Sequence, residues 1–387
     1  MFILIENGEL YLPEPAGKGS LLIAGREIVK TGDVDRRALD KLGVECDRID
    51  AKGSYVTPGL IDAHEHLLGG SGESGFATQT PELTATEIIE AAITSVVGCL
   101  GVDTTMKTMP GLLAKVKGLK EEGLGAYMWT GGYNVPPTTI TDSVRNDIMF
   151  IDEIIGLGEV AIADKRSTDP TLHELARLTN DAYVAGMMSN KAGATHFHVG
   201  ERKERLKLLF ELLDCYETPP ECIYATHIQR SDELLADAAE LSKRGCYVDI
   251  DTVDEDLAKQ LRRFIDKGGN MERLTFSSDA SVTPPATVFG QLRDCVLNHG
   301  FSLEQILPLV TSNVAEVLKL ANKGSLKTGA AADVLVIENS SLELVEVIAG
   351  GKRLFRDGKL AFKEAFLADS ERDIRLDGEK PLQIAAA

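Results

Sequence analysis

The sequence of 387 residues lacks any apolar run near the ~20 residues of a membrane-spanning helix. Its first ten residues lack the basic start and long apolar stretch of a secretory signal, so we expect none. The six cysteines form no C-x-x-C pair, which argues against a disulfide framework and a thiolate zinc cluster. We therefore predict a reduced, cytoplasmic chain that does not bind a membrane.

Basic residues are few relative to acidic ones, with 41 Lys and Arg against 60 Asp and Glu and a net charge of −19. Such a charge repels phosphate backbones and anionic lipids, which argues against nucleic acid or membrane partners. A few local arginines could still bind an anionic small substrate. Hydrophobic residues at 43% and charged residues at 26% are ordinary values for a globular protein.

Both ends of the chain have the pattern of short strands. Residues 1–56 hold apolar runs broken by glycine, and residues 324–362 repeat this pattern with Gly-Gly and Asp-Gly turns. We predict that residues 1–56 and 324–387 together build a small β-sandwich domain around a long insert.

The insert, residues 57–323, alternates apolar runs with amphipathic helical stretches, which predicts an α/β fold. Eight strand–helix units in this length predict a TIM-like (β/α)₈ barrel. A doubly wound sheet is the alternative, but it would usually show a glycine-rich phosphate loop after its first strand. The eight strand candidates are Leu60–His66, Ser95–Gly101, Gly125–Gly131, Glu159–Asp164, Thr195–Gly200, Ile223–Ile228, Tyr247–Asp251 and Leu274–Asp279.

Histidines gather where these strands end, which in a barrel is the catalytic face. His64 and His66 are two residues apart on a strand, so both imidazoles point the same way and can reach one metal ion. His198 and His227 end strands five and six, and Asp279 ends strand eight. Imidazole and carboxylate groups are common zinc ligands, so this set predicts a metal-dependent hydrolase barrel.

Each of these residues taken alone has a simpler explanation. A single buried histidine is usually a core residue with a hydrogen-bond partner, and Asp279 could cap a helix. We expect His196 to lie in the core or to support the ligands. His173 and His299 fall in helical or loop stretches, where we expect no role at the site.

Glu159, at the start of the predicted fourth strand, is a candidate bridge between two metal ions. Four histidines and one aspartate need another anion to hold two divalent ions about 3.5–4 Å apart. The alternative is a solvated acid after the loop Gly156-Leu157-Gly158.

With this set of residues, the chain resembles the amidohydrolase superfamily, whose first-strand signature is matched by Pro58-Gly59-Leu60-Ile61-Asp62-x-His64-x-His66. It is most similar to the isoaspartyl (β-aspartyl) dipeptidase family. The segments that carry this resemblance include His66-Leu67-Leu68-Gly69-Gly70-Ser71-Gly72-Glu73, Thr130-Gly131-Gly132-Tyr133, Asp164-Lys165-Arg166-Ser167, Phe197-His198-x-Gly200, Ala225-Thr226-His227-x-x-Arg230 and Ser277-Ser278-Asp279.

The resemblance implies a barrel with a small β domain, two Zn²⁺ ions, with other divalent metals as alternatives, and a homo-oligomer. It implies hydrolysis of a small-molecule dipeptide whose N-terminal aspartate is linked through its side-chain carboxyl. His64 and His66 would ligate one ion and His198 and His227 the other. Asp279 would ligate the first ion and carry protons, so that a metal-bound hydroxide attacks the peptide carbonyl.

The resemblance also implies a substrate site. Glu73, in the segment with Ser71 and Gly72, would accept the substrate ammonium, and Tyr133 would donate to the oxyanion. The carboxylates would be held by Arg166 and Arg230, while Thr283 stands where the family places a serine.

The sequence departs from this family at three positions. The family's bridging residue is a carboxylated lysine, and alignment from Asp164 puts the shorter Glu159 there. Lys165 is a poor substitute because it lies past the ligand position. Val102 replaces a polar threonine and Gln79 replaces an arginine, which could shift the preferred substrate.

Two other functions remain open. A cyclic-amide hydrolase or an N-acyl amino-acid deacylase would share the fold and metals. Glu73 favours the dipeptidase, because a cyclic amide has no ammonium to bind. A metal-free scaffold protein is the third reading, and the complete ligand set argues against it.

Overall fold

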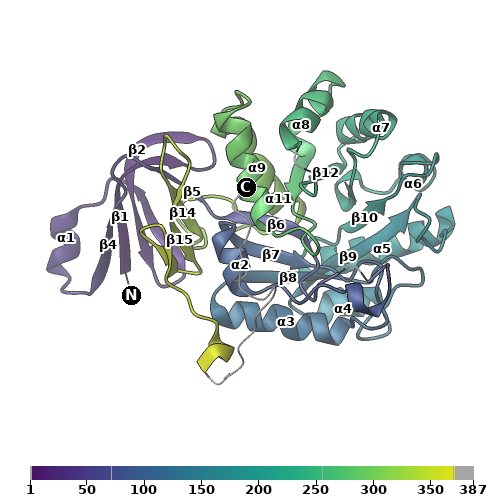
Figure 1. Ribbon diagram of the computed structural model, residues 1–387, viewed down its shortest axis with the longest axis horizontal. Coiled ribbons are helices and arrows are strands. Elements are labelled where there is room, and N and C mark those ends of the chain that lie inside the picture. Colours follow the sequence, from purple (N-terminus) through teal and green to yellow (C-terminus); the bar gives the residue numbers. More distant parts are fainter. Residues whose placement is uncertain (1, 71, 255, 369, 371–387) are drawn as a thin grey trace.

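The computed structural model describes residues 2–70, 72–254, 256–368 and 370. Its strands form two sheets, one of eight strands and one of nine, which lie at opposite ends of the molecule in Figure 1. Within the described residues, no helix is long and apolar enough to cross a membrane.

The eight-stranded sheet is the predicted barrel. Its strands pair in chain order, and every neighbouring pair is parallel. A parallel bridge from Glu65 to Ala280 joins the first strand to the segment after the last, so the sheet nearly closes. The strands are β6 (Leu60–Glu65), β7 (Ile93–Gly98), β8 (Gly125–Thr130), β9 (Ile154–Ile162), β10 (Thr195–Val199), β11 (Ile223–Thr226), β12 (Tyr247–Asp251) and β13 (Leu274–Ser277).

A helix follows each barrel strand, which confirms the predicted (β/α)₈ class. Several begin with the expected capping signals; Thr84 and Thr171 each form a capping box with the glutamate three residues on. The eight helices are α2 (Ala85–Glu90), α3 (Met109–Glu122), α4 (Val144–Phe150), α5 (Leu172–Ser189), α6 (Lys207–Tyr216), α7 (Asp232–Lys243), α8 (Leu257–Asp266) and α9 (Ala286–Leu297).

Shorter helices lie outside this repeat. The α-helices are α1 (Arg36–Lys41), α10 (Leu303–Ile306) and α11 (Ser312–Val317). The 3₁₀ turns are η1 (Phe76–Thr78), η2 (Pro220–Cys222), η3 (Met271–Arg273), η4 (Leu307–Val310) and η5 (Ala365–Ala368).

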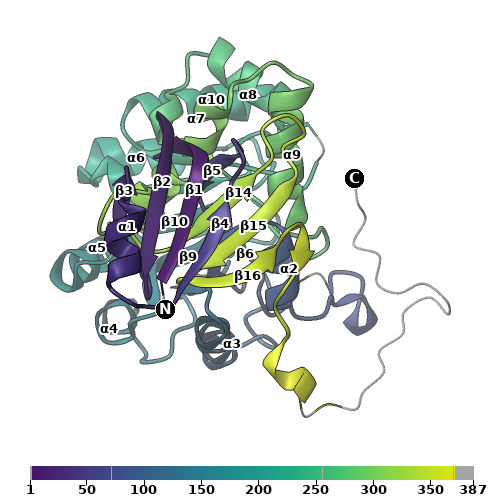
Figure 2. The same cartoon turned by 90° about the vertical axis from the view of Figure 1, so that its left-hand side faces the viewer.

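The nine-stranded sheet combines both ends of the chain, as Figure 2 shows. Strand β5 pairs with β1 on one side and with β14 on the other, which joins the N-terminal and C-terminal strands. The strands are β1 (Phe2–Tyr11), β2 (Pro15–Ala24), β3 (Glu27–Gly32), β4 (Cys46–Asp50), β5 (Tyr55–Pro58), β14 (Val334–Ile337), β15 (Leu344–Ala349), β16 (Lys352–Arg356) and β17 (Lys359–Leu360).

Strand β1 divides this sheet into two arms. Its first half pairs with β4 and its second half with β5. Both arms contribute to one apolar core, to which Ile5, Ile49 and Val334 belong. This arrangement fits the predicted small β domain. The division into domains at 56/57 and 323/324 stays a proposal.

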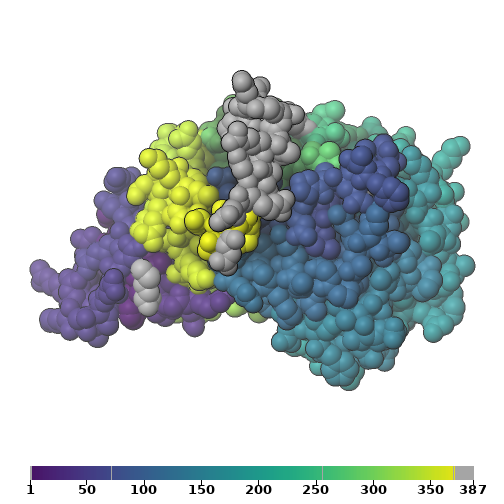
Figure 3. Space-filling view, turned by 60° about the horizontal axis from the view of Figure 1, so that its bottom comes forward, coloured from purple at the N-terminus to yellow at the C-terminus, as the bar shows by residue number. Residues whose placement is uncertain are grey.

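The C-terminal strands lie between the N-terminal strands and the barrel in Figure 3. Strand β16 packs on α2 of the barrel, and Lys352 donates to the carbonyl oxygen of Glu121 at 3.3 Å. The β domain thus contacts the barrel through its C-terminal part.

Candidate metal centre and active site

The structure brings all six predicted metal ligands together at the carboxyl ends of the barrel strands. The Glu159 carboxylate lies between two groups of histidines. Its Oε2 is 3.3 Å from Nε2 of His64, and its Oε1 is 2.8 Å from Nδ1 of His198 and 3.4 Å from Nε2 of His227. Asp279 approaches the same nitrogen of His64, with Oδ1 3.4 Å from Nε2 of His64 and 3.1 Å from Nε2 of His66.

Glu159 points into the barrel because β9 has an irregularity there. The register with β10 runs from Leu157 opposite Thr195 to Val160 opposite Phe197, so β9 carries one extra residue between them. A bulge of this kind re-aims a side chain. The strand begins at Ile154, before the predicted start at Glu159. The alternative of a solvated loop acid is wrong, since Glu159 is fully buried.

The donor set fits divalent metal ions. Three groups of ligand residues share members, and within each group the ligand atoms all lie within 4.8 Å of one another. His64 is fully buried, and neither ring nitrogen has a hydrogen-bond partner among the residues that the structure describes. A buried imidazole without a partner is costly, and coordination of a cation would satisfy it. Asp279 and His227 adopt φ values of 49° and 65°, uncommon for residues other than glycine and typical of functional sites.

The electrostatics keep the carboxylates ionised and the phenol protonated. Burial disfavours the charged form of Glu159, but His64, with His198 and His227, holds its pKa well below the usual range. Asp279 has a lowered pKa because His64 and His66 outweigh the same burial effect. Burial, and then the charge of Glu159, raises the pKa of Tyr133 well above its ordinary value. Tyr133 can therefore act as a hydrogen-bond donor.

Two aspartates orient the histidines. Neither of them was identified from the sequence. Oδ2 of Asp164 lies 3.0 Å from Nε2 of His198, and Oδ2 of Asp251 lies 2.7 Å from Nδ1 of His227. Carboxylates in this position fix the ring orientation of metal-ligating histidines. Asp251 ends a predicted barrel strand and Asp164 ends another, which was the available signal.

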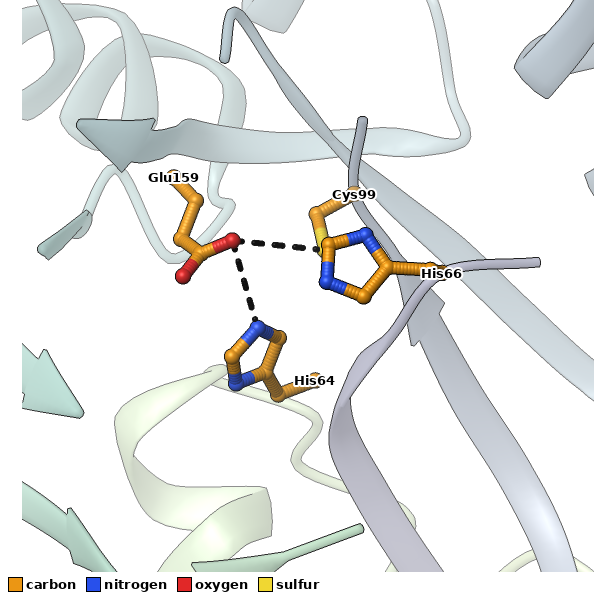
Figure 4. A group of neighbouring side chains, drawn as sticks. All are labelled: His64, His66, Cys99 and Glu159. Carbon is orange, nitrogen blue, oxygen red and sulfur yellow. Dashed lines mark hydrogen bonds and ion pairs between the residues drawn. The ribbon is translucent and has the colours of Figure 1, made fainter. Parts of the chain in front are cut away.

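Cys99 is a further residue at the centre that sequence reasoning missed. It follows β7 directly, and its Sγ lies 3.6 Å from Nδ1 of His66 and 3.9 Å from Oε2 of Glu159. Figure 4 shows its side chain with those of His64, His66 and Glu159. The sequence shows no cysteine pair, so Cys99 was not predicted as a ligand. Its place at the end of a strand was nevertheless the same signal that identified the histidines.

Three of the predicted substrate-binding residues, Glu73, Arg166 and Arg230, line a hollow beside the ligand cluster. Tyr133 is buried, with its hydroxyl oxygen 2.7 Å from Nδ1 of His198. Arg166 donates to Glu73 at 2.7 Å and to Asp164 at 2.9 Å. Arg230 donates to the carbonyl oxygen of Val199 at 2.8 Å. A hollow of about 400 Å³ is lined by Glu73, Asp164, Lys165, Arg166, Glu201, Arg202 and Arg230, and a second contains Arg230, His227 and Asp279.

Of the other predicted substrate residues, the structure describes Gly72 and Thr283. Gly72 has a φ of 87°, and its N–H donates to the carbonyl oxygen of Thr78 at 3.3 Å. The hydroxyl of Thr283 is buried and has no hydrogen-bond partner within the described part of the chain. Ser71 lies outside the described residues.

The remaining histidines behave as expected. His196 is fully buried in the barrel and stacks on Trp129, with ring centroids 5.2 Å apart. Burial lowers its pKa well below the ordinary value. His173 lies on α5 beside Tyr216, and His299 forms a surface ion pair with Asp294 at 3.0 Å.

A comparison with family models decides the wider identity of this fold and site. The model described as the amidohydrolase family matches residues 55–360. The chain belongs to the amidohydrolase family. The predicted membership and the prediction of a hydrolase are confirmed.

Solved structures give a closer relationship within the amidohydrolases. A β-aspartyl dipeptidase from Fervidobacterium islandicum AW-1 is 37% identical, with a TM-score of 0.89 over 93% of this chain and 98% of that chain. A complex with the dipeptide β-Asp-Leu, from the same organism, is 36% identical with a TM-score of 0.88 over 93% and 97%. The predicted resemblance to β-aspartyl dipeptidases is confirmed.

Curated amidohydrolase relatives are more distant. An adenine deaminase from Halalkalibacterium halodurans is 24% identical over 92% of this chain, but the chain spans only 58% of that protein's length. A dihydroorotase from Lactobacillus gasseri is 25% identical over 87% of this chain and 89% of that protein.

Among the positions where the sequence was predicted to depart from the family pattern, Glu159 is buried within the ligand cluster, whereas Val102 and Gln79 lie outside it. Lys165 is exposed in the turn after β9. The side-chain nitrogen of Gln79 donates to Sδ of Met106 at 3.3 Å, and Val102 is 41% exposed.

Proposed function

We propose that this chain is a metal-dependent dipeptidase that hydrolyses β-aspartyl dipeptides. The observation that carries the proposal is the match to the β-aspartyl dipeptidase and its β-Asp-Leu complex over 93% of the chain. In support of it, the predicted substrate residues Glu73, Arg166 and Arg230 line one hollow, and Tyr133 contacts His198 of the ligand cluster.

The metal complement that we propose is two divalent ions per chain, with zinc in the cell. His64, His66 and Asp279 would hold one ion, His198 and His227 the other, and Glu159 would contact both. The two oxygens of Glu159, which face the two groups of histidines, support this division. Ions bound there would polarise the peptide carbonyl and lower the pKa of a water molecule to near neutrality.

Asp279 and Tyr133 would carry the proton transfers and charge stabilisation. The lowered pKa of Asp279 leaves it ionised and able to accept the proton of the attacking water. It would then return the proton to the amine that leaves. Tyr133 stays protonated and would donate to the oxygen on which negative charge develops.

Recognition of a β-aspartyl dipeptide would rest on charge. Such a substrate carries one ammonium and two carboxylates. Glu73 and Arg166, which pair at 2.7 Å, offer one charge of each sign, and Arg230 offers a second positive charge. Substrate carboxylates can accept paired hydrogen bonds from the guanidinium groups.

The experiment that tests this function compares substrates on the metal-loaded full chain. We expect β-Asp-Leu to be cleaved well and α-Asp-Leu hardly at all, because Glu73 and the arginines would position only the side-chain amide at the ligands. Equal rates on both linkages would contradict the proposal. Activity confined to cyclic amides or N-acyl amino acids would instead favour those reactions, and a chain purified without metal would favour the scaffold reading.

A homo-oligomer in the cytoplasm, with small-molecule partners and no nucleic acid or membrane partner, completes the proposal. Large apolar side chains on the surface, such as Phe76 at 86% and Phe150 at 73% exposed, are available for contacts between subunits. Light scattering coupled to size-exclusion chromatography would give the number of chains directly.

A further inference from the structure

Cys99 lies inside the ligand cluster and not merely beside it. Its side chain is 1% exposed and faces His66 and Glu159 at 3.6 and 3.9 Å. Ligand atoms of His64, His66, Cys99 and Glu159 all lie within 4.8 Å of one another. Figure 4 shows the four side chains, which come from three barrel strands, converging on one point.

We propose that Cys99 is a metal ligand, which would bind as a thiolate to the ion that the proposed function assigns to His64, His66, Asp279 and Glu159. For two ligands at the tetrahedral angle on zinc, with Zn–S at about 2.3 Å and Zn–N or Zn–O at about 2.0–2.1 Å, sulfur lies about 3.5 Å from the neighbouring ligand atom, and Asp279 would be a fifth ligand of this ion. The observed 3.6 and 3.9 Å are close to this edge length. The 3.3 Å from His64 to Glu159 fits the corresponding nitrogen–oxygen edge.

His64 gives this ligand set an independent support. It is fully buried, it lies against Glu159, and both its ring nitrogens lack hydrogen-bond partners among the described residues. Thiol, imidazole and carboxylate groups gathered at one buried point are the donors that zinc binds. The thiol would release its proton on binding, and the thiolate would add a negative charge that offsets part of the double charge of the ion.

A thiolate ligand would also compensate for Glu159, which stands where the resemblance implies a carboxylated lysine. Glu159 has a shorter reach than the carboxylated lysine that the resemblance implies. Cys99 would add a negative ligand to the ion near β6, while the ion near His198 and His227 would have nitrogen and oxygen ligands. Soft thiolate favours zinc over harder divalent ions, so the two ions would differ in metal preference. This inference rests on the metal site of the proposed function.

The first test uses cobalt(II), whose coordination by thiolate gives an intense charge-transfer absorption in the near ultraviolet. The full chain is stripped of metal and loaded with cobalt(II) alone. We expect the absorption in the parent protein and its loss in Cys99→Ser, with an affinity for one ion at least about tenfold lower. Cys222→Ser is the matched control: this thiol is also buried, at 1% exposed, and belongs to none of the ligand groups found among the described residues.

The second test needs no variant, so it holds even if Cys99→Ser fails to fold. X-ray absorption of the zinc-loaded parent should show a sulfur neighbour at about 2.3 Å. A zinc shell of nitrogen and oxygen alone, or a parent protein that binds no metal, would overturn the proposal. β-Asp-Leu turnover is measured on the same samples. A thiolate signal without turnover would contradict the proposed dipeptidase function but support Cys99 as a ligand. Turnover without the thiolate signal would support the dipeptidase function and contradict Cys99 as a ligand.

Discussion

The hydroxyl oxygen of Tyr133 lies 2.7 Å from Nδ1 of His198, the same nitrogen that lies 2.8 Å from Oε1 of Glu159. Tyr133 follows β8, and His198 lies on β10. The proposed oxyanion donor thus contacts a proposed ligand directly. A substrate carbonyl oxygen bound near this nitrogen would come within reach of the Tyr133 hydroxyl. The contact between Tyr133 and His198 therefore couples the position of the hydrogen-bond donor to the position of the proposed metal ligands.

Replacing Tyr133 with phenylalanine should remove this donor and keep the buried ring. We expect kcat to fall by about 10²–10³, the usual loss when one oxyanion donor is removed. Metal content should stay at the parent value, because the phenol is not among the proposed ligands. Steady-state kinetics with β-Asp-Leu and metal analysis check both. Tyr216→Phe, at a partly exposed tyrosine beside His173, serves as the control. Parent-like turnover in Tyr133→Phe would remove the phenol from the mechanism.

Asp279→Asn should remove the proposed proton carrier without disturbing the fold. The amide has nearly the same shape but cannot accept the proton of water, so we expect kcat to fall by about 10²–10⁴. Circular dichroism and the thermal midpoint should stay close to those of the parent. Metal counted per chain on the same sample reports whether the aspartate also acts as a ligand. Near-full turnover with metals bound would show that another group carries the proton.

Arg353 joins the two ends of the chain in the nine-stranded sheet, and its loss should destabilise the protein. It donates to Glu346 at 2.7 Å and to Asp47 at 2.9 Å, and its side chain is 9% exposed. Arg353→Met would leave the buried carboxylate of Glu346, which is 1% exposed, without a counter-charge, although the N–H of Asp357 would still donate to it at 3.1 Å. We expect the free energy of unfolding to fall by about 3–5 kcal/mol.

Urea denaturation at neutral pH measures this loss. Arg48→Met is the control, because Arg48 and Asp40 form an exposed ion pair whose removal should cost about 1 kcal/mol or less. The double variant with Glu346→Leu should recover part of the loss. Equal stability of parent and Arg353→Met would mean that the chain ends are held together by the apolar core alone.

The barrel could be predicted from the sequence because each parallel strand is an apolar run that ends in polar residues. This pattern involves only residues close together in the sequence, so it can be recognised without the structure. Tyr247–Asp251 was predicted to the residue, while β9 begins at Ile154 and not at Glu159. The start of β9 was missed because its two glycines resemble a loop. In the structure, Gly156 and Gly158 lie where a side chain would meet Trp129 and His196, so close packing explains them.

The ligand residues were predicted as a set because the ends of neighbouring parallel strands meet in space. Their partners also stand at strand ends, but the sequence alone does not show which histidine each of them contacts. Asp251 reaches His227, and Asp164 reaches His198, across residues far apart in the sequence. Cys99 was set aside because it has no cysteine partner nearby in the sequence. The structure shows that its neighbours are instead His66 and Glu159 from other strands.

Glu159 leads to the last prediction, which concerns how the metal site is rebuilt. A carboxylated lysine forms only when carbon dioxide adds to a neutral amine, so a site based on it needs carbon dioxide or bicarbonate. A glutamate carries its anion permanently, and the neighbouring histidines already hold the pKa of Glu159 well below the usual range. Metal-free protein should therefore regain full activity with zinc alone in carbon-dioxide-free buffer.

Two variants sharpen this prediction. Glu159→Ala should bind metal more weakly, because two dications would face each other without the shared anion, and a small carboxylate such as propionate should restore part of the binding. Lys165→Ala should reconstitute like the parent, because Lys165 is exposed and outside the ligand groups of the described residues. Reconstitution is followed with and without bicarbonate, with metal counted per chain. A requirement for bicarbonate would make a lysine the bridge. Two tightly bound metals in Glu159→Ala would show instead that His64, His198 and their neighbours hold the ions without it.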